Sequence, residues 1–276
     1  VIYDARRGGL VAARDPIGLR PLYYGYDAEG AIVFASEAKN LVGLCAHVFP
    51  FPPGHYYKDG KFVCYADLTT VTKYSDDDLD TVTKTIREKL IAGVEKRLDA
   101  DAPLGFLLSG GLDSSLLSSL SNQVLRERGE TLHTFSVDYW DNDRYFRKSH
   151  FQPTSDPAYI RAMERYLGCQ HHWTVLDTPA LAEALYAAVD ARDLPGMVDV
   201  DSSLLLFCGE IRKEVTVALS GECADELFGG YPWYRDPEVR ERDGFPWAQT
   251  TDYRATFLKP EFLLEETPQE YVHRRY

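Results

Sequence analysis

The stretch Gly105-Phe106-Leu107-Leu108-Ser109-Gly110-Gly111-Leu112-Asp113-Ser114-Ser115 decides the fold class. Its apolar start predicts a strand, and the apolar positions that follow it recur at helical spacing. The residues between are serines and paired glycines, which let the backbone approach a ligand closely while free amides at the helix start point toward negative charge. The loop has no lysine, so it differs from the GxxxxGK[ST] and GxGxxG loops. It therefore predicts a site for an anionic group such as phosphate.

Strands and helices alternate from about residue 76 onward. We expect strands at 104–108, 132–137, 172–176 and 215–219, and helices at about 82–98, 114–128, 157–167 and 204–213, with a further helix starting at Thr178. Such alternation is typical of an α/β protein with a doubly wound parallel sheet. Ligands of these sheets bind at the carboxyl ends of the strands.

Residues 1–66 have a different pattern, in which short β-type runs are separated by turn residues such as Arg7-Gly8-Gly9. This pattern predicts antiparallel hairpins, too few for an independent sandwich. An acidic run at Ser75-Asp76-Asp77-Asp78 interrupts this β-type pattern and predicts a solvated linker. We place a domain boundary there, giving domains 1–75 and 76–276.

A second loop repeats the first arrangement. The apolar run 215–219 leads into Ser220-Gly221-Glu222-Cys223-Ala224-Asp225-Glu226, in which three carboxylates repel one another unless a cation compensates. Asp113, beside a phosphate site, also needs a cation to compensate its charge. Mg²⁺ can supply that charge, because it is held by carboxylates and phosphate oxygens. The alternatives are that Asp113 only caps its helix, and that the second loop is a polar turn before a capped helix.

Composition excludes some functions. The net charge of -13 disfavours nucleic acid and anionic membranes as partners. No apolar run reaches the roughly 20 residues of a membrane span, and no signal peptide is evident, so we expect a cytoplasmic protein. The five cysteines lack a CxxC pair and indicate neither a disulfide framework nor a zinc site.

The two loops together resemble the synthetase domain of glutamine-dependent asparagine synthetases, of the ATP-pyrophosphatase (adenine nucleotide α-hydrolase) fold. The segments RDPIGLRPLYY (14–24), FASEAK (34–39) and FPPG (51–54) resemble the end of that family's Ntn-type glutaminase domain. The resemblance spans residues 1 to about 235. It implies aspartate, ATP and ammonia or glutamine as substrates, Mg²⁺ as cofactor, and leaves a homodimer open.

The resemblance also implies residue roles. ATP would activate the aspartate carboxylate as β-aspartyl-AMP, and ammonia would then displace AMP. Residues 109–114, among them Ser109, Gly110, Gly111, Asp113 and Ser114, would hold the pyrophosphate. Asp113 and Asp225 would bind Mg²⁺. Leu107, Val137, Ser220 and Gly221 would contact the adenosine. Glu222 matches the residue that forms and aminolyses the adenylate, where a carboxylate can take a proton from ammonia.

The chain departs from the family at its ends. The family's glutaminase uses an amino-terminal cysteine as nucleophile, whereas residue 1 here is Val and the upstream glutamine-binding segments are absent. Neither Cys45 nor Cys64 can substitute, so we expect no glutamine hydrolysis by this chain. A phosphate-binding lysine of the family lies beyond Tyr276, and we interpret the chain as a fragment. Two other functions stay open: a related adenylating enzyme, such as a β-lactam synthetase or a macrolactam cyclase, and a non-catalytic nucleotide-binding protein.

Three further features have structural interpretations. Adjacent strand positions place His171 and His172 on opposite faces, which disfavours a shared metal. The aromatic run at 139–151 predicts a packing cluster rather than a base-stacking surface. Asp156 precedes Pro157 and predicts a helix cap, with the metal site as the alternative.

Overall fold

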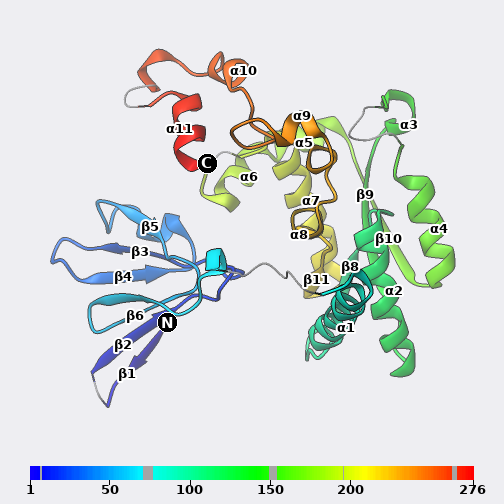
Figure 1. Cartoon of the computed structure of the whole chain (residues 1–276), viewed down its shortest axis with the longest axis horizontal. Coiled ribbons are helices and arrows are strands. Elements are labelled where there is room, and N and C mark those ends of the chain that lie inside the picture. Colours follow the sequence, from blue (N-terminus) through cyan, green and yellow to red (C-terminus); the bar gives the residue numbers. More distant parts are fainter. Residues whose placement is uncertain (7, 71–76, 149–153, 195, 263–265) are drawn as a thin grey trace. The chain divides into compact units, whose positions relative to one another are not determined.

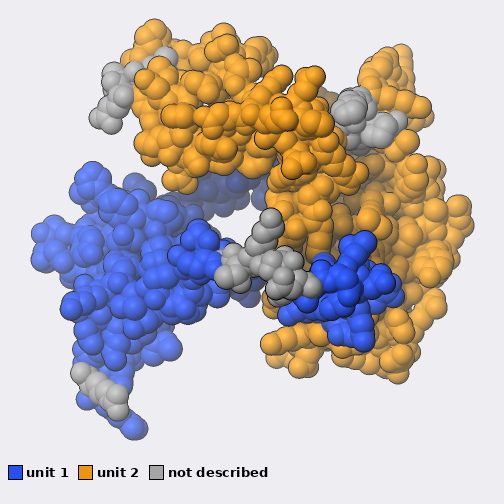
Figure 2. Space-filling view, in the orientation of Figure 1, with its two compact units in different colours: residues 1–89, 179–206 blue, residues 90–178, 207–276 orange. Residues whose placement is uncertain are grey.

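A computed structural model of the chain describes residues 1–6, 8–70, 77–148, 154–194, 196–262 and 266–276. The chain divides into two compact units, one formed by residues 1–89 with 179–206 and the other by 90–178 with 207–276 (Figure 2). The boundary predicted at residue 75 lies outside the described residues, as do Arg7, Ser75, Asp76 and Phe151. The division into domains 1–75 and 76–276 therefore stays a prediction.

Seven short antiparallel strands form two small sheets in the first unit (Figure 1). One has the order β1-β2-β6-β7 (Ile2–Asp4, Gly9–Ala13, His55–Lys58 and Lys61–Cys64). The other has the order β4-β3-β5 (Ile32–Ala35, Tyr23–Tyr26 and Val48–Pro50). The fully buried Phe51 has ring contacts at 6.0 Å with Phe34 and 5.2 Å with Phe62, which joins the two sheets. The predicted antiparallel hairpins are thus confirmed, whereas their glutaminase-type assignment stays a prediction.

A four-stranded parallel sheet organises the second unit. Its order is β10-β9-β8-β11, with β8 at Leu104–Leu107, β9 at His133–Tyr139, β10 at Gln170–Leu176 and β11 at Val217–Leu219. The chain moves outward from β8 to β10 and then returns to place β11 on the other side of β8. Strand order therefore reverses between β8 and β11, where ligands of such sheets bind. The predicted parallel α/β sheet is confirmed.

Helices cover both faces of this sheet. Phe106 and Leu108 pack with Leu125 of α2 (Leu112–Glu127) and Ile160 of α4 (Pro157–Leu167). On the other face, residues of β8 and β9 pack with Phe207 and its neighbours in α7 (Val198–Glu214). In Figure 1 the strands accordingly lie between α7 and the pair α2 and α4. None of the described helices is long and apolar enough to cross a membrane.

The remaining helices are mostly short. They are α1 (Leu79–Arg97), η1 (Ala38–Leu41), η2 (Leu68–Thr70), α3 (Asn142–Tyr145), α5 (Thr178–Glu183), α6 (Leu185–Arg192), α8 (Ala224–Phe228), η3 (Pro232–Tyr234), α9 (Pro237–Arg240), α10 (Asp252–Ala255), η4 (Pro260–Phe262) and α11 (Pro268–Arg275). Helix α7 begins six residues earlier than expected. Strand β11 begins two residues later than expected, because the Val215 amide still donates to the Ile211 carbonyl.

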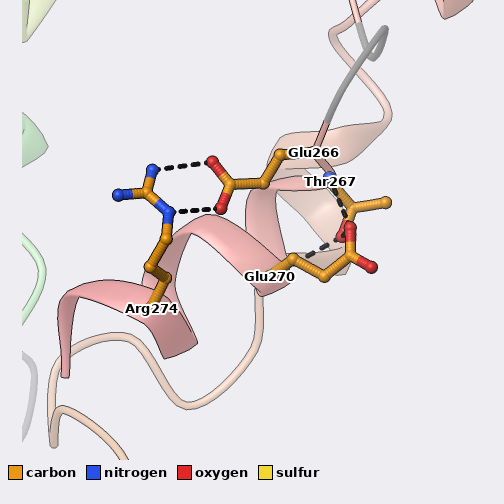
Figure 3. Close-up of polar contacts among 4 residues, drawn as sticks. All are labelled: Glu266, Thr267, Glu270 and Arg274. Carbon is orange, nitrogen blue, oxygen red and sulfur yellow. Dashed lines mark hydrogen bonds and ion pairs between the residues drawn. The ribbon is translucent and has the colours of Figure 1, made fainter.

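Polar contacts define the last helix, as Figure 3 shows. Thr267 accepts a bond from the Glu270 amide, and the Glu270 carboxylate accepts from the Thr267 amide, which makes a capping box. The Arg274 guanidinium donates to both oxygens of Glu266, at 2.7 and 2.8 Å. Nearby, the Tyr276 ring packs edge-on against Phe245. The carboxyl-terminal segment is therefore packed on itself rather than a free tail.

Candidate active site

A cavity of ≈ 320 Å³ lies at the carboxyl ends of β8 and β11, where the strand order reverses. Its walls come from the ends of β8 and β9, the loops after β8 and β11, and helices α4 and α7. The predicted site residues that line it are Leu107, Ser109, Gly111, Asp113, Ser114, Val137, Ser220, Gly221, Glu222 and Asp225. Residues from distant parts of the sequence therefore meet in one pocket.

Gly110 is the one predicted site residue that does not line the cavity. Its φ is +77°, and a Cβ there would lie 2.7 Å from the Tyr159 Cβ and 2.8 Å from the Ile160 amide nitrogen. Only glycine satisfies both the left-handed backbone and this close approach to α4. The structure thus gives Gly110 a packing role, and its binding role stays a prediction.

Serine side chains organise the loop after β8. The Ser114 hydroxyl is buried, accepts from the Ser109 amide at 3.2 Å and donates to the Gly111 carbonyl at 3.2 Å. The Ser109 and Ser114 hydroxyls are 3.0 Å apart. Helix α2 starts at Leu112, with Gly111 as a cap that offers no side chain. Asp113 therefore lies in the first helical turn rather than at the cap position, among amides that favour an anionic ligand.

The loop after β11 holds two carboxylates at the cavity. The Glu222 amide donates to the Ser220 hydroxyl at 3.1 Å, and Cys223 has a left-handed backbone that turns the chain into α8. Asp225 lies in the first turn of α8, and a Cβ on Gly230 would overlap its carboxylate. Glu222 thus precedes the helix, and both carboxylates face the same cavity.

A fourth carboxylate, Asp156, also lines the cavity. The predicted helix-cap role is wrong, because its backbone is already helical (ψ -33°) and its side chain makes no capping hydrogen bond. Asp113, Asp156, Glu222 and Asp225 bring four negative groups to the pocket, and no Lys, Arg or His is among its described lining residues. A bound anion such as a nucleotide therefore needs metal ions or other cations here.

The carboxylates fit Mg²⁺ but do not form a complete protein cage. No group of three or more His, Cys, Asp or Glu side chains in the described part of the chain could hold a metal ion. Mg²⁺ commonly uses only one or two carboxylates together with substrate phosphates and water. Asp113 and Asp225, from adjacent loops, meet that requirement when the phosphates supply the other ligands.

Tyr231 and Phe207 also line the cavity, and sequence reasoning did not single them out. The Tyr231 hydroxyl donates to Glu226 at 3.2 Å, and its ring stacks on Trp233 at 4.3 Å. Burial, followed by the hydrogen bond to Glu226 and the negative charge of the nearby carboxylates, raises the pKa of Tyr231 to about 12. The Gly229-Gly230 pair just before Tyr231 is the sequence feature that could have pointed to this tyrosine. Phe207 reaches the pocket from α7, and no local motif connects that helix to the pocket.

The histidines are held by packing. His171 Nδ1 lies 2.7 Å from the Thr134 hydroxyl, while His172 stacks on Phe135 at 4.6 Å and lies 3.2 Å from His133. The structural interpretation of His171 and His172 is confirmed.

Two of the aromatic side chains after β9 lie largely on the surface. Trp140 is 70% exposed and Tyr145 is 62% exposed. The packing prediction is therefore wrong for these two side chains.

Two family models match the chain. The asparagine synthase model matches residues 85–276, and the glutamine amidotransferase domain model matches residues 1–53.

Several curated proteins are similar over most of the chain. Asparagine synthetase [glutamine-hydrolyzing] 3 of Bacillus subtilis (strain 168) is 35% identical, with 100% of this chain and 49% of that protein aligned. Asparagine synthetase [glutamine-hydrolyzing] 3 of Arabidopsis thaliana is 34% identical over 87% of this chain and 42% of its own length. The chain thus spans about half the length of these relatives. Among solved structures, an NAD⁺ synthetase from Burkholderia pseudomallei is 18% identical, with a TM-score of 0.34 over 53% of this chain and 65% of that chain.

Proposed function

Because the chain belongs to the asparagine synthase family, we propose that its parallel sheet carries the adenylating site of an ATP-dependent ligase that forms asparagine from aspartate. The observation that carries this proposal is the meeting of the two loops in one pocket at the switch between β8 and β11. A lone glycine-serine loop supports only phosphate binding, whereas two loops with acidic groups suit a magnesium nucleotide and a reacting carboxylate.

The first loop is proposed to bind the phosphates. The hydroxyl of Ser109 and the amides at the start of α2 are preorganised by Ser114, so little reorganisation is needed when charge develops on the leaving pyrophosphate. Asp113 and Asp225 would hold Mg²⁺, which supplies charge neutralisation and Lewis acidity when bound. This division suits adenylation, in which the protein positions groups rather than supplying a nucleophile.

The adenosine is proposed to lie on Leu107 and Val137, at the ends of β8 and β9, with Ser220 and Gly221 on the β11 side. An apolar slot with backbone hydrogen bonds is typical of such sites. Glu222 lines the same cavity, and a carboxylate there can take the proton that ammonia loses when it attacks β-aspartyl-AMP. We infer that the ammonia normally comes from glutamine, because residues 1–53 match an amidotransferase domain and the relatives are named glutamine-hydrolyzing, while the chain itself, with no glutaminase nucleophile identified in it, uses free ammonia.

The test is exchange of labelled pyrophosphate into ATP, followed by asparagine formation with added ammonium. We expect exchange that requires both Mg²⁺ and aspartate, with glutamate and other carboxylates supporting little. Exchange stimulated by another carboxylate but not by aspartate would contradict the substrate assignment. Wild-type exchange in an Asp113→Asn variant would contradict the site.

A further inference from the structure

Helix α8 carries Asp225, one of the proposed metal ligands, yet it has only five residues. Isolated helices shorter than about 12 residues are marginal in water, so other groups must hold α8 in place. The residues just beyond it do so. Gly229, in a left-handed conformation, and Gly230 both donate their amides to the Asp225 carbonyl, which closes the helix. The helix end is therefore fixed through the same residue whose side chain lines the cavity.

The Asp225 carboxylate packs against the backbone of Gly230. A Cβ on residue 230 would overlap one oxygen of that carboxylate, although the Gly230 backbone is not in the left-handed region. Glycine is thus needed at residue 230 for space rather than for backbone conformation. A side chain there would push aside the flexible end of Asp225 and leave the backbone unstrained.

Tyr231 holds this turn against α8. Its hydroxyl donates to Oε1 of Glu226 at 3.2 Å, and Glu226 is the neighbour of Asp225 on the helix. The Tyr231 ring stacks on Trp233 at 4.3 Å, and the Trp233 ring contacts Trp247 at 6.3 Å. One side chain therefore connects α8 to the aromatic rings of the carboxyl-terminal segment.

We propose that Gly230 and Tyr231 are positioning residues, which set where the Asp225 carboxylate stands and hence how tightly the magnesium nucleotide binds. The proposal rests on the proposed function, in which Asp225 is a metal ligand. Groups that orient a ligand carboxylate without touching the metal commonly control its affinity. The proposal gives a role to the Gly229-Gly230-Tyr231 stretch that follows the second loop.

The variant Gly230→Ala tests the contact with Asp225. The added methyl group occupies the place of the carboxylate, which can swing aside at little cost in stability. We expect the affinity for Mg²⁺ with α,β-methylene ATP to fall about tenfold, at the low end of such outer-shell effects, with no lower stability in urea. Gly93→Ala, in open space on α1, is the control and should bind as the wild type does. Wild-type affinity in Gly230→Ala would overturn the role of Gly230.

Removal of the Tyr231 hydroxyl tests the bond to Glu226. Tyr231→Phe keeps the ring, so it and Glu226→Ala should each weaken the same binding about threefold, as expected for one exposed hydrogen bond. The double variant should bind no more weakly than either single one, because both remove one interaction. Glu226→Gln keeps an acceptor and should recover most of the affinity lost in Glu226→Ala. Tyr234→Phe, which loses a hydroxyl from the same segment, is the control. Wild-type affinity in Tyr231→Phe, or additive losses in the double variant, would overturn the role of Tyr231.

Amide hydrogen exchange without ligand separates this proposal from the proposed function. If the wild-type chain binds no magnesium nucleotide, the proposed function fails, and the positioning role is judged from exchange alone. Faster exchange at the Gly229 and Gly230 amides in Tyr231→Phe, but not in Tyr234→Phe, supports that role. Equal exchange in the two variants overturns it.

Discussion

The backbone of Gly221 lies directly against that of Asp113, so that a Cβ on residue 221 would stand 3.1 Å from the Asp113 carbonyl carbon and 3.2 Å from its Cβ. The loops after β8 and β11 therefore touch at a point where no side chain fits freely. This contact fixes the separation of the phosphate-binding loop from Glu222 and Asp225, on which the proposed chemistry depends.

Gly221→Ala should consequently weaken magnesium-nucleotide binding. The Asp113 backbone must shift by a few tenths of an ångström to admit the methyl group. A shift that costs about 1.4 kcal/mol of binding free energy means roughly a tenfold weaker affinity. Gly93→Ala is the control, because Gly93 lies inside α1 with open space around it. That control should leave affinity unchanged and slightly raise stability. Isothermal titration calorimetry measures the nucleotide affinity of each variant. Equal affinities of the two variants would show that the loops adjust freely.

Neutralising the proposed metal ligands should remove the Mg²⁺ dependence of nucleotide binding. Asp113→Asn and Asp225→Asn keep the side-chain size but lose the charge that offsets the cation. We expect binding at saturating Mg²⁺ to fall at least tenfold, close to the level without Mg²⁺, because a nucleotide then meets only uncompensated carboxylates. Asp101→Asn, in an exposed loop before β8, is the control. A full Mg²⁺ response in either variant would remove that residue from the site.

Asp156 and Asp236 allow a paired test, because each precedes a proline at a helix start. Asp236 accepts from the Glu238 amide at 3.0 Å, whereas Asp156 makes no such bond and lines the cavity. Asp236→Ala should accelerate amide exchange in α9 about fivefold, as expected for loss of about 1 kcal/mol of capping. Asp156→Ala should leave exchange at the start of α4 unchanged but weaken Mg²⁺-dependent nucleotide binding. The reverse pattern would restore the helix-cap interpretation of Asp156.

The same pair shows where sequence reasoning fails. Asp-Pro predicts a cap at both positions, yet ψ is 113° at Asp236 and -33° at Asp156, and only the extended backbone turns the carboxylate toward the helix amides. That difference comes from packing, which a local pattern does not contain. The parallel sheet and the loop residues from Leu107 to Ser114 were predictable because they are contiguous and follow one apolar strand. The pocket walls at Phe207 and Tyr231 depend on long-range packing and were missed.

Acidification should destabilise the second unit through its half-buried histidines. Burial lowers the pKa of His171 below its ordinary value of 6.5, and burial followed by the nearby His172 lowers the pKa of His133. A lowered folded pKa means that the unfolded chain binds protons more readily, so this stability is present above pH 6.5 and is lost as pH falls below it. Urea unfolding between pH 7.5 and 5 should show this loss.

Single histidine variants identify the source of that pH dependence. His171→Asn should reduce it, whereas His273→Asn, at an exposed position in α11, should not. Equal pH dependence in His171→Asn and the wild type would exclude His171 as a contributor.

Tyr231 gives a prediction at the opposite end of the pH scale. Its pKa is raised from 10.0 to about 12, first by burial and then by its bond to Glu226 and the surrounding carboxylates. The folded state therefore holds the proton more tightly than the unfolded state does. The corresponding stability is fully present below pH 10 and declines as pH rises toward 12. Tyr231→Phe lacks this titration, so the wild type should lose its stability advantage over the variant between those pH values, as measured by urea unfolding at each pH. Ultraviolet absorbance should also show one fewer late-ionising tyrosine in the variant. Ionisation of Tyr231 together with the exposed tyrosines near pH 10 would mean that the carboxylates of the second loop are not gathered around it.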